Sequence, residues 1–246
     1  MLLFRASMLR QLLIVLAISG CASFEPALRY ADLMKPRAPT VKETQEGVEV
    51  SIEEFASKNK SQQAFDADIA LAGILALLIR VENGGTETYR VQERAVSAYL
   101  GTEALPSMTG EAAAAQGANS EYVGKALGWT LAAGPFAIFL WPATIGGSAS
   151  HTAAVNRRIE QHFESMRFTD SLLKPNQMAA GFFYFKLPSA VTKLENLRVE
   201  VTPSQEQTGK QLSFKFTLPT IDLSGAVAAP AANTSSEGRP SPSDHQ

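Results

Sequence analysis

Short runs in which apolar and polar residues alternate occur in two blocks of this 246-residue chain, residues 47–101 and 171–224. Alternation with a period of two places the apolar side chains on one face of a β-strand. Roughly six or seven such strands, separated by turn residues, are typical of an antiparallel β-sandwich. We therefore expect a mainly β fold. The clearest alternating sets are Val48, Val50 and Ile52; Leu197, Val199 and Val201; and Leu212, Phe214, Phe216 and Leu218.

Two of the expected strands, residues 74–82 and 180–187, are apolar on both faces at their centres. Strands of this kind are buried on both sides, so they belong in the middle of the fold. Asn83-Gly84-Gly85 follows the first of them and is a turn signal. We predict a core in facing sheets that is built from Leu77, Ile79, Phe183, Phe185, Phe214 and Phe216.

A helical insertion, residues 102–170, is expected between the two β blocks. Residues 111–116 are rich in alanine, the residue with the highest helix propensity. Further on, apolar residues recur at helical spacing, with charged residues off that stripe, which predicts an amphipathic helix. The apolar stripe consists of Val155, Ile159, Phe163 and Met166.

Within the insertion, residues 126–149 contain no Asp, Glu, Lys or Arg. A run of this length could cross a bilayer, which takes roughly 20 apolar residues. Pro135 and Pro142 favour a bent helical hairpin, because each proline removes a helix hydrogen bond. Three interpretations stay open: packing on the sandwich, insertion into a membrane, and contact with a partner. The candidate membrane or partner contacts are Trp129, Phe136, Phe139 and Trp141.

The start of the chain has the parts of an export signal in their usual order. Two arginines precede an apolar run over residues 12–18, then Ser19 and Gly20, and then Cys21, the only cysteine. The run Leu16–Cys21 resembles the lipobox of bacterial lipoproteins. The resemblance implies that residues 1–20 are a signal peptide that is removed. It also implies that the Cys21 thiol carries lipid and that Ala22 favours sorting to the outer membrane.

Two further consequences concern the ends of the mature chain. Residues 21–46 contain Pro26, Pro36 and Pro39 and show no apolar period, so we expect a lipidated tether. Residues 225–246 are Ala, Pro and Ser with few apolar anchors, which predicts a disordered tail.

The β runs also carry a weaker resemblance. Leu77–Asn83 is a strand that stops at an Asn turn, and Leu173–Asn176 is a turn that leads into Gly181–Phe185. These runs look like the strand ends of immunoglobulin-like or telokin-like domains of exported bacterial proteins. The resemblance implies an immunoglobulin-like antiparallel β-sandwich. The apolar helical hairpin and the amphipathic helix expected above would interrupt it.

Composition restricts the chemistry. With a single cysteine the chain can form no internal disulfide. Removal of the leader leaves 20 basic and 24 acidic residues, a net charge of −4, and no basic stripe suited to nucleic acid. Of the histidines, His245 lies in the expected tail, and His151 and His162 are too far apart along one helix to share a metal. His162 is expected at the surface, and we predict no cofactor and no metal.

The sequence therefore predicts a non-enzymatic, membrane-tethered lipoprotein that acts as a binding or structural module of the cell envelope, with an envelope protein as its possible partner. An alternative is a membrane-active protein that inserts or oligomerises through residues 126–149. A third, less favoured hypothesis is a hydrolase that uses His151 or His162.

Overall fold

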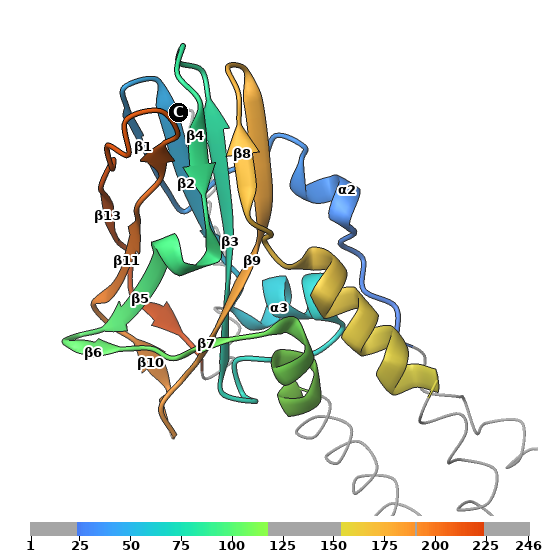
Figure 1. Ribbon diagram of the computed structural model, residues 1–246. Helices are drawn as coiled ribbons and strands as arrows, with labels where there is room; N and C mark the ends of the chain where they lie inside the picture. The colour runs from blue at the N-terminus through green and yellow to red at the C-terminus, as the bar shows by residue number, and fades with distance from the viewer. Residues whose placement is uncertain (1–23, 118–153, 190, 224–246) are drawn as a thin grey trace, which may run out of the picture.

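The chain forms a β-sandwich with helices along one side, as a computed structural model shows (Figure 1). The structure describes residues 24–117, 154–189 and 191–223. Every pairing between named strands is antiparallel. The predicted mainly β sandwich is thus confirmed.

One layer of the sandwich is a five-stranded sheet in the order β1-β2-β3-β9-β7. Its centre is the ten-residue ladder between β3 and β9, in which Ile74 pairs with Lys186 and Asn83 with Gln177. These are the two strands whose sequence is apolar on both faces. The strands are β1 (Val41–Gln45), β2 (Val48–Glu54), β3 (Ile74–Asn83), β9 (Gln177–Lys186) and β7 (Ser107–Met108).

The other layer consists of a four-stranded sheet, β13-β11-β5-β6, and a three-stranded sheet, β12-β4-β8. The chain passes from β4 to β5 through a short 3-10 helix, η1 (Glu93–Ala95). A two-stranded pair, β10 (Lys193–Leu194) with β14 (Ile221–Asp222), completes the β structure of the described residues. The larger sheets use β13 (Phe214–Thr217), β11 (Leu197–Val201), β5 (Val96–Leu100), β6 (Glu103–Ala104), β12 (Ser204–Gln205), β4 (Tyr89–Val91) and β8 (Ser171–Leu173).

The main core lies between these two layers. Alternate residues of β2, β3 and β9 meet alternate residues of β5, β11 and β13 there. The six core residues predicted from the alternation are confirmed. Their exposed fractions are 0% for Leu77, Ile79 and Phe214, 1% for Phe185, 6% for Phe216 and 8% for Phe183.

A second core covers the other face of the five-stranded sheet. Helices at residues 110–117 and 154–166, together with α3 (Lys58–Phe65) and α2 (Tyr30–Leu33), pack over β3 and β9 there. In Figure 1 they form a layer on one side of the strands. The predicted amphipathic helix is confirmed, since Ile159, Phe163 and Met166 are buried and Val155 packs partly against the same core. We call these helices, with the segments joining them to the sheet, the helical layer.

The backbone at Phe168, just before β8, lies very close to Gly181 of β9. A Cβ atom built on Gly181 would lie 2.4 Å from Phe168 Cα and 2.5 Å from Phe168 N. Real Cβ atoms do not approach backbone so closely, so only glycine fits at this point of β9.

Two expected boundaries are wrong. The expected tether, residues 21–46, contains α2 and β1, and all five residues of β1 pair with β2. The prolines lie outside these two elements, so they did not prevent either from forming. The expected insertion, residues 102–170, begins with β6 and β7, which belong to the two sheets. The expected hairpin of residues 126–149 and the tail of residues 225–246 lie outside the described residues.

Candidate functional site

The functional residues predicted from the sequence all lie outside the described part of the structure. These are Cys21, for lipid attachment, and Trp129, Phe136, Phe139 and Trp141, for membrane or partner contact. They stay predictions. The described residues nevertheless include the chain that flanks each of these segments.

The segment nearest to Cys21 is held against the helical layer. The amide of Glu25 donates a hydrogen bond to Asp66 Oδ2 at 3.1 Å. Two residues later, the amides of Ala27 and Leu28 both donate to the carbonyl of Gln63, each at 3.0 Å. The Leu28 side chain is buried in the second core. Residues 24–28 therefore form part of the folded domain.

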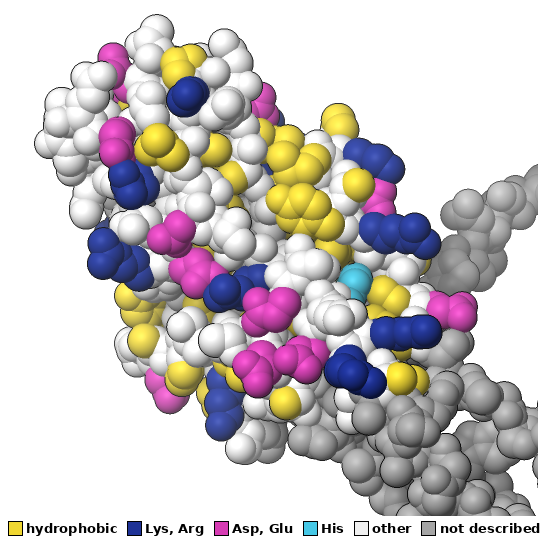
Figure 2. Space-filling view, turned by 45° about the vertical axis from the view of Figure 1, so that its right-hand side comes forward, with side chains coloured by type: hydrophobic (Ala, Val, Ile, Leu, Met, Phe, Trp, Pro, Cys, Tyr) yellow, Lys and Arg dark blue, Asp and Glu magenta, His cyan; other side chains and the backbone are white. Residues whose placement is uncertain are grey.

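His162 lies under the start of this segment. Its ring meets that of Phe24 edge-on, with 5.3 Å between the centroids, and also contacts Phe65 and Phe163. Its Nε2 atom lies 2.7 Å from the carbonyl oxygen of Ala64. A carbonyl can only accept, so Nε2 carries a proton and donates it. The histidine is half-buried and reaches the surface as a small patch (Figure 2).

This position corrects the expectation of a surface histidine. Helical spacing places His162 next to the apolar stripe, but no pattern in the sequence indicates that Phe24 covers it. Burial lowers the pKa of His162 below its usual range, and the bond to the Ala64 carbonyl opposes that shift more weakly. With Nε2 bonded to a backbone carbonyl, the ring serves packing in this structure. His151 and His245, the other histidines, lie outside the described residues.

The helical layer also holds both ends of the segment that contains residues 126–149. The described chain stops at Gly117 and resumes at Ala154. Gly117 is close to the second core, because a Cβ atom built there would lie 3.9 Å from Phe163 Cζ. Gln116 Nε2 donates to the carbonyl of Ala72 at 2.6 Å and ties this helix to the loop before β3. The lipid-proximal segment and both flanks of the uncharged segment thus belong to one layer.

A group of ion pairs joins Arg37, which precedes β1, and Lys60 of α3 to the end of β2. Arg37 forms a double hydrogen bond with Glu53, at 2.7 and 3.1 Å, which raises the pKa of Arg37 above its usual range. Lys60 lies 3.2 Å from Glu54 and 3.6 Å from Glu53. Both cations also lie over the ring of Phe55. Two cations and two carboxylates are matched here, as in a structural ion-pair cluster.

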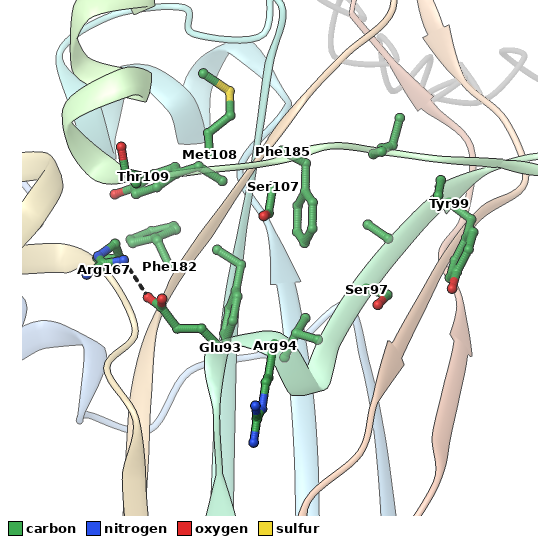
Figure 3. Close-up of a pocket in the computed structure, with 16 residues that line it drawn as sticks. Glu93, Arg94, Ser97, Tyr99, Ser107, Met108, Thr109, Arg167, Phe182 and Phe185 are labelled. Atoms are coloured by element: carbon green, nitrogen blue, oxygen red, sulfur yellow. Dashed lines mark ion pairs between the residues drawn. The ribbon is translucent and has the colours of Figure 1, made fainter.

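A cavity of about 460 Å³ lies elsewhere, between β5, β7 and β9 (Figure 3). The Phe185 ring and the Ser107 hydroxyl point into the same space from neighbouring strands. At one side, Arg167 Nη1 lies 2.7 Å from Glu93 Oε1, and Arg167 Nε lies 3.1 Å from Glu164 Oε2, outside hydrogen-bonding geometry. The volume falls within the range of about 300–1,000 Å³ that is typical of small-molecule sites.

The cavity is lined by aromatic, hydroxyl-bearing and charged side chains. The described residues that line it include no histidine, cysteine or lysine. The carboxylate of Glu93 is paired with Arg167. The sequence analysis missed this cavity, because its lining comes from four separate stretches of chain.

Three further observations concern the surface and its charges. Within residues 24–117, 154–189 and 191–223, no group of three or more His, Cys, Asp or Glu residues is placed to hold a metal. No helix in these ranges is long and apolar enough to cross a membrane. Basic and acidic side chains are interspersed over the face shown in Figure 2, which therefore carries no basic patch suited to nucleic acid.

Comparison with known proteins gives little further guidance. No family model matches the chain, and no curated protein matches it. Among solved structures, it is similar to a Bacillus subtilis protein described as a "putative lipoprotein (ycdA)", with 11% identity and a TM-score of 0.35. The similarity covers 74% of this chain but 39% of that protein. At this identity and TM-score the likeness transfers no function to this chain.

Proposed function

We propose that this chain is a lipid-anchored protein of the cell envelope, whose sandwich domain is a non-enzymatic binding or structural module. The observation that carries the proposal is the signal-like run that ends at Cys21, three residues before Phe24, whose ring packs against His162. Acyl chains contribute about 0.8 kcal/mol per buried CH₂ group, so two or three chains on one cysteine hold a domain stably at a bilayer. Ala22 supports an outer-membrane destination.

We also propose a ligand site and a partner for this module. The cavity between β5, β7 and β9 is the candidate ligand site, because aromatic rings and serine and threonine hydroxyls line it. An envelope protein is the proposed macromolecular partner.

A second candidate function is membrane insertion or oligomerisation through residues 126–149. The observation that favours it is that both flanks of this segment, at Gly117 and Ala154, belong to the layer that holds the lipid-proximal Phe24. A segment that starts and ends in this layer would lie near the bilayer whenever Cys21 is acylated.

The anchor is tested by Cys21→Ser. Without the thiol no thioether to diacylglycerol can form, so we expect the variant to keep its leader or to appear in the soluble fraction. Incorporation of a labelled fatty acid and membrane fractionation are the measurements. Ala22→Asp is the matched control, because it keeps the thiol and should change only the destination membrane. Normal acylation and membrane association of Cys21→Ser would overturn the proposal.

A further inference from the structure

We infer that the helical layer is the surface of this domain that faces the bilayer, with the loop at residues 69–73 as its point of contact with lipid. The inference rests on the lipid attachment at Cys21 that is proposed above. It adds an orientation, which lipid attachment alone does not require.

The length of chain between the lipid and the domain carries the first step. Cys21 precedes Phe24 by three residues, and an extended chain spans at most about 3.6 Å per residue. The Cα atoms of Cys21 and Phe24 are therefore no more than about 11 Å apart. The polar region of one leaflet is itself about 5–8 Å thick. An acylated Cys21 thus brings Phe24 to the membrane surface.

The second step is that this short connection cannot lengthen while the domain stays folded. The Phe24 ring lies against His162, and the amides of Glu25, Ala27 and Leu28 donate to groups of α3 and its end. Releasing more chain would break these three hydrogen bonds and expose Leu28. The bilayer must then lie next to the part of the domain that holds Phe24, which is the helical layer.

The third step is an exposed apolar side chain in the same layer. Leu71 is 70% exposed, more than either of the other large apolar side chains at the surface of the described residues, Tyr30 and Leu172. Its loop is fixed on both sides. The amide of Ile69 donates to Ser61 Oγ of α3 at 2.9 Å, and the carbonyl of Ala72 accepts from Gln116 at 2.6 Å. A rigid loop that presents leucine to solvent fits the interfacial region of a bilayer, where apolar side chains are buried at shallow depth.

The opposite face of the sandwich supplies a control position. The five-stranded sheet and the main core separate the helical layer from β13. Phe214 and Phe216 of β13 face that core, and Thr217 next to them is exposed on the outer face. Thr217 should therefore stay in water.

The experiment uses the full, acylated chain. Because Cys21 is the only native cysteine and its thiol is consumed by the lipid, an introduced cysteine is the only free thiol. Leu71→Cys and Thr217→Cys are each labelled with an environment-sensitive fluorophore. The proteins are then placed in phosphatidylethanolamine–phosphatidylglycerol vesicles that contain a lipid with a shallow nitroxide quencher. We expect a blue shift and a loss of emission at position 71, and neither at position 217.

Vesicle flotation separates the two proposals. A protein that floats with vesicles but shows no quenching at position 71, or equal quenching at both positions, overturns the orientation and leaves the anchor in place. A chain that does not float, in the form with Cys21 intact, contradicts the anchor itself.

A longer connection tests the second step. Twelve Gly and Ser residues inserted between Ser23 and Phe24 add a flexible chain with a root-mean-square span of about 20 Å. We expect this variant to float as before and to lose the quenching at position 71. Full quenching with the longer connection would overturn the role of the short one.

Discussion

At the scale of single residues, His162 couples the helical layer to pH. Its ring is covered by Phe24, and burial lowers its pKa in the folded domain. In the unfolded chain a histidine titrates near its usual value of about 6.5. Between these two values the unfolded chain binds more protons than the folded domain, so the free energy of unfolding falls as the pH falls.

This coupling predicts the effect of one substitution. The stabilising contribution of neutral His162 is fully present above about pH 6.5 and is lost as the pH falls through the lower folded-state pKa. His162→Gln can still donate a hydrogen bond to Ala64 but cannot titrate, so we expect a flatter stability profile between about pH 7 and pH 5. Chemical denaturation at several pH values measures it. Gln161→Ala, an exposed and uncharged position on the same helix, is the control and should keep the slope of the unchanged protein. Equal slopes for both variants would contradict the assignment.

At the scale of elements, β13 closes one edge of the four-stranded sheet with two stacked phenylalanines. The Phe214 and Phe216 rings lie with their centroids 6.5 Å apart and face the core, while Lys215 between them points to solvent. A strand of four residues thus contributes two large side chains to the sandwich.

We expect Phe214→Ala and Phe216→Ala each to lower the free energy of unfolding by about 3–5 kcal/mol, because each leaves a cavity in a packed core. Urea denaturation of the purified domain is the measurement. Lys215→Ala is the matched control, and its 3.8 Å ion pair with Glu200 is largely exposed, so its effect should stay within about 0.5 kcal/mol. Losses near zero for both phenylalanine variants would mean that this strand is not part of the core.

The elements also show which parts of the fold were predictable from sequence. β2, β11 and β13 show a period of two in the sequence, whereas β3 and β9 show short runs that are apolar on both faces. The apolar stripe predicts the helix at residues 154–166. The two-residue strands β6, β7, β10, β12 and β14 are too short to show any period. β1 was missed because its apolar content is a single valine, and its pairing with β2 depends on backbone hydrogen bonds, which leave no pattern in side chains.

The docking of residues 24–28 on the helical layer was also hard to predict, because it too depends on backbone hydrogen bonds. Amides of residues 24–28 donate to Gln63 and Asp66, and within these five residues Phe24 and Leu28 add apolar contact. The lipobox resemblance located Cys21, but no sequence signal indicated that the chain would dock three residues later.

At the scale of the whole molecule, the five-stranded sheet lies between the helical layer and the layer of smaller sheets. Both flanks of the uncharged segment, residues 126–149, belong to the helical layer. If residues 126–149 pack on the domain, their deletion should lower the free energy of unfolding, and vesicles should leave tryptophan emission unchanged. We expect this result for a binding or structural module. Trp129 and Trp141 are the only tryptophans, so Trp129→Phe and Trp141→Phe assign the signal to one residue. A blue shift with vesicles, together with a deletion that costs no stability, would favour the membrane-active alternative.

The β3–β9 ladder has a consequence for how the chain reaches this structure. Its two strands lie on opposite sides of the entire insertion in sequence, yet together they form a wall of both cores. Closing so long a loop carries an entropic cost before any contact is gained, and folds that depend on distant pairings fold slowly. A nascent chain that ends before Gln177 lacks β9 and can complete neither core. We therefore expect both the sandwich and the helical layer to be completed only after β9 has been added to the chain.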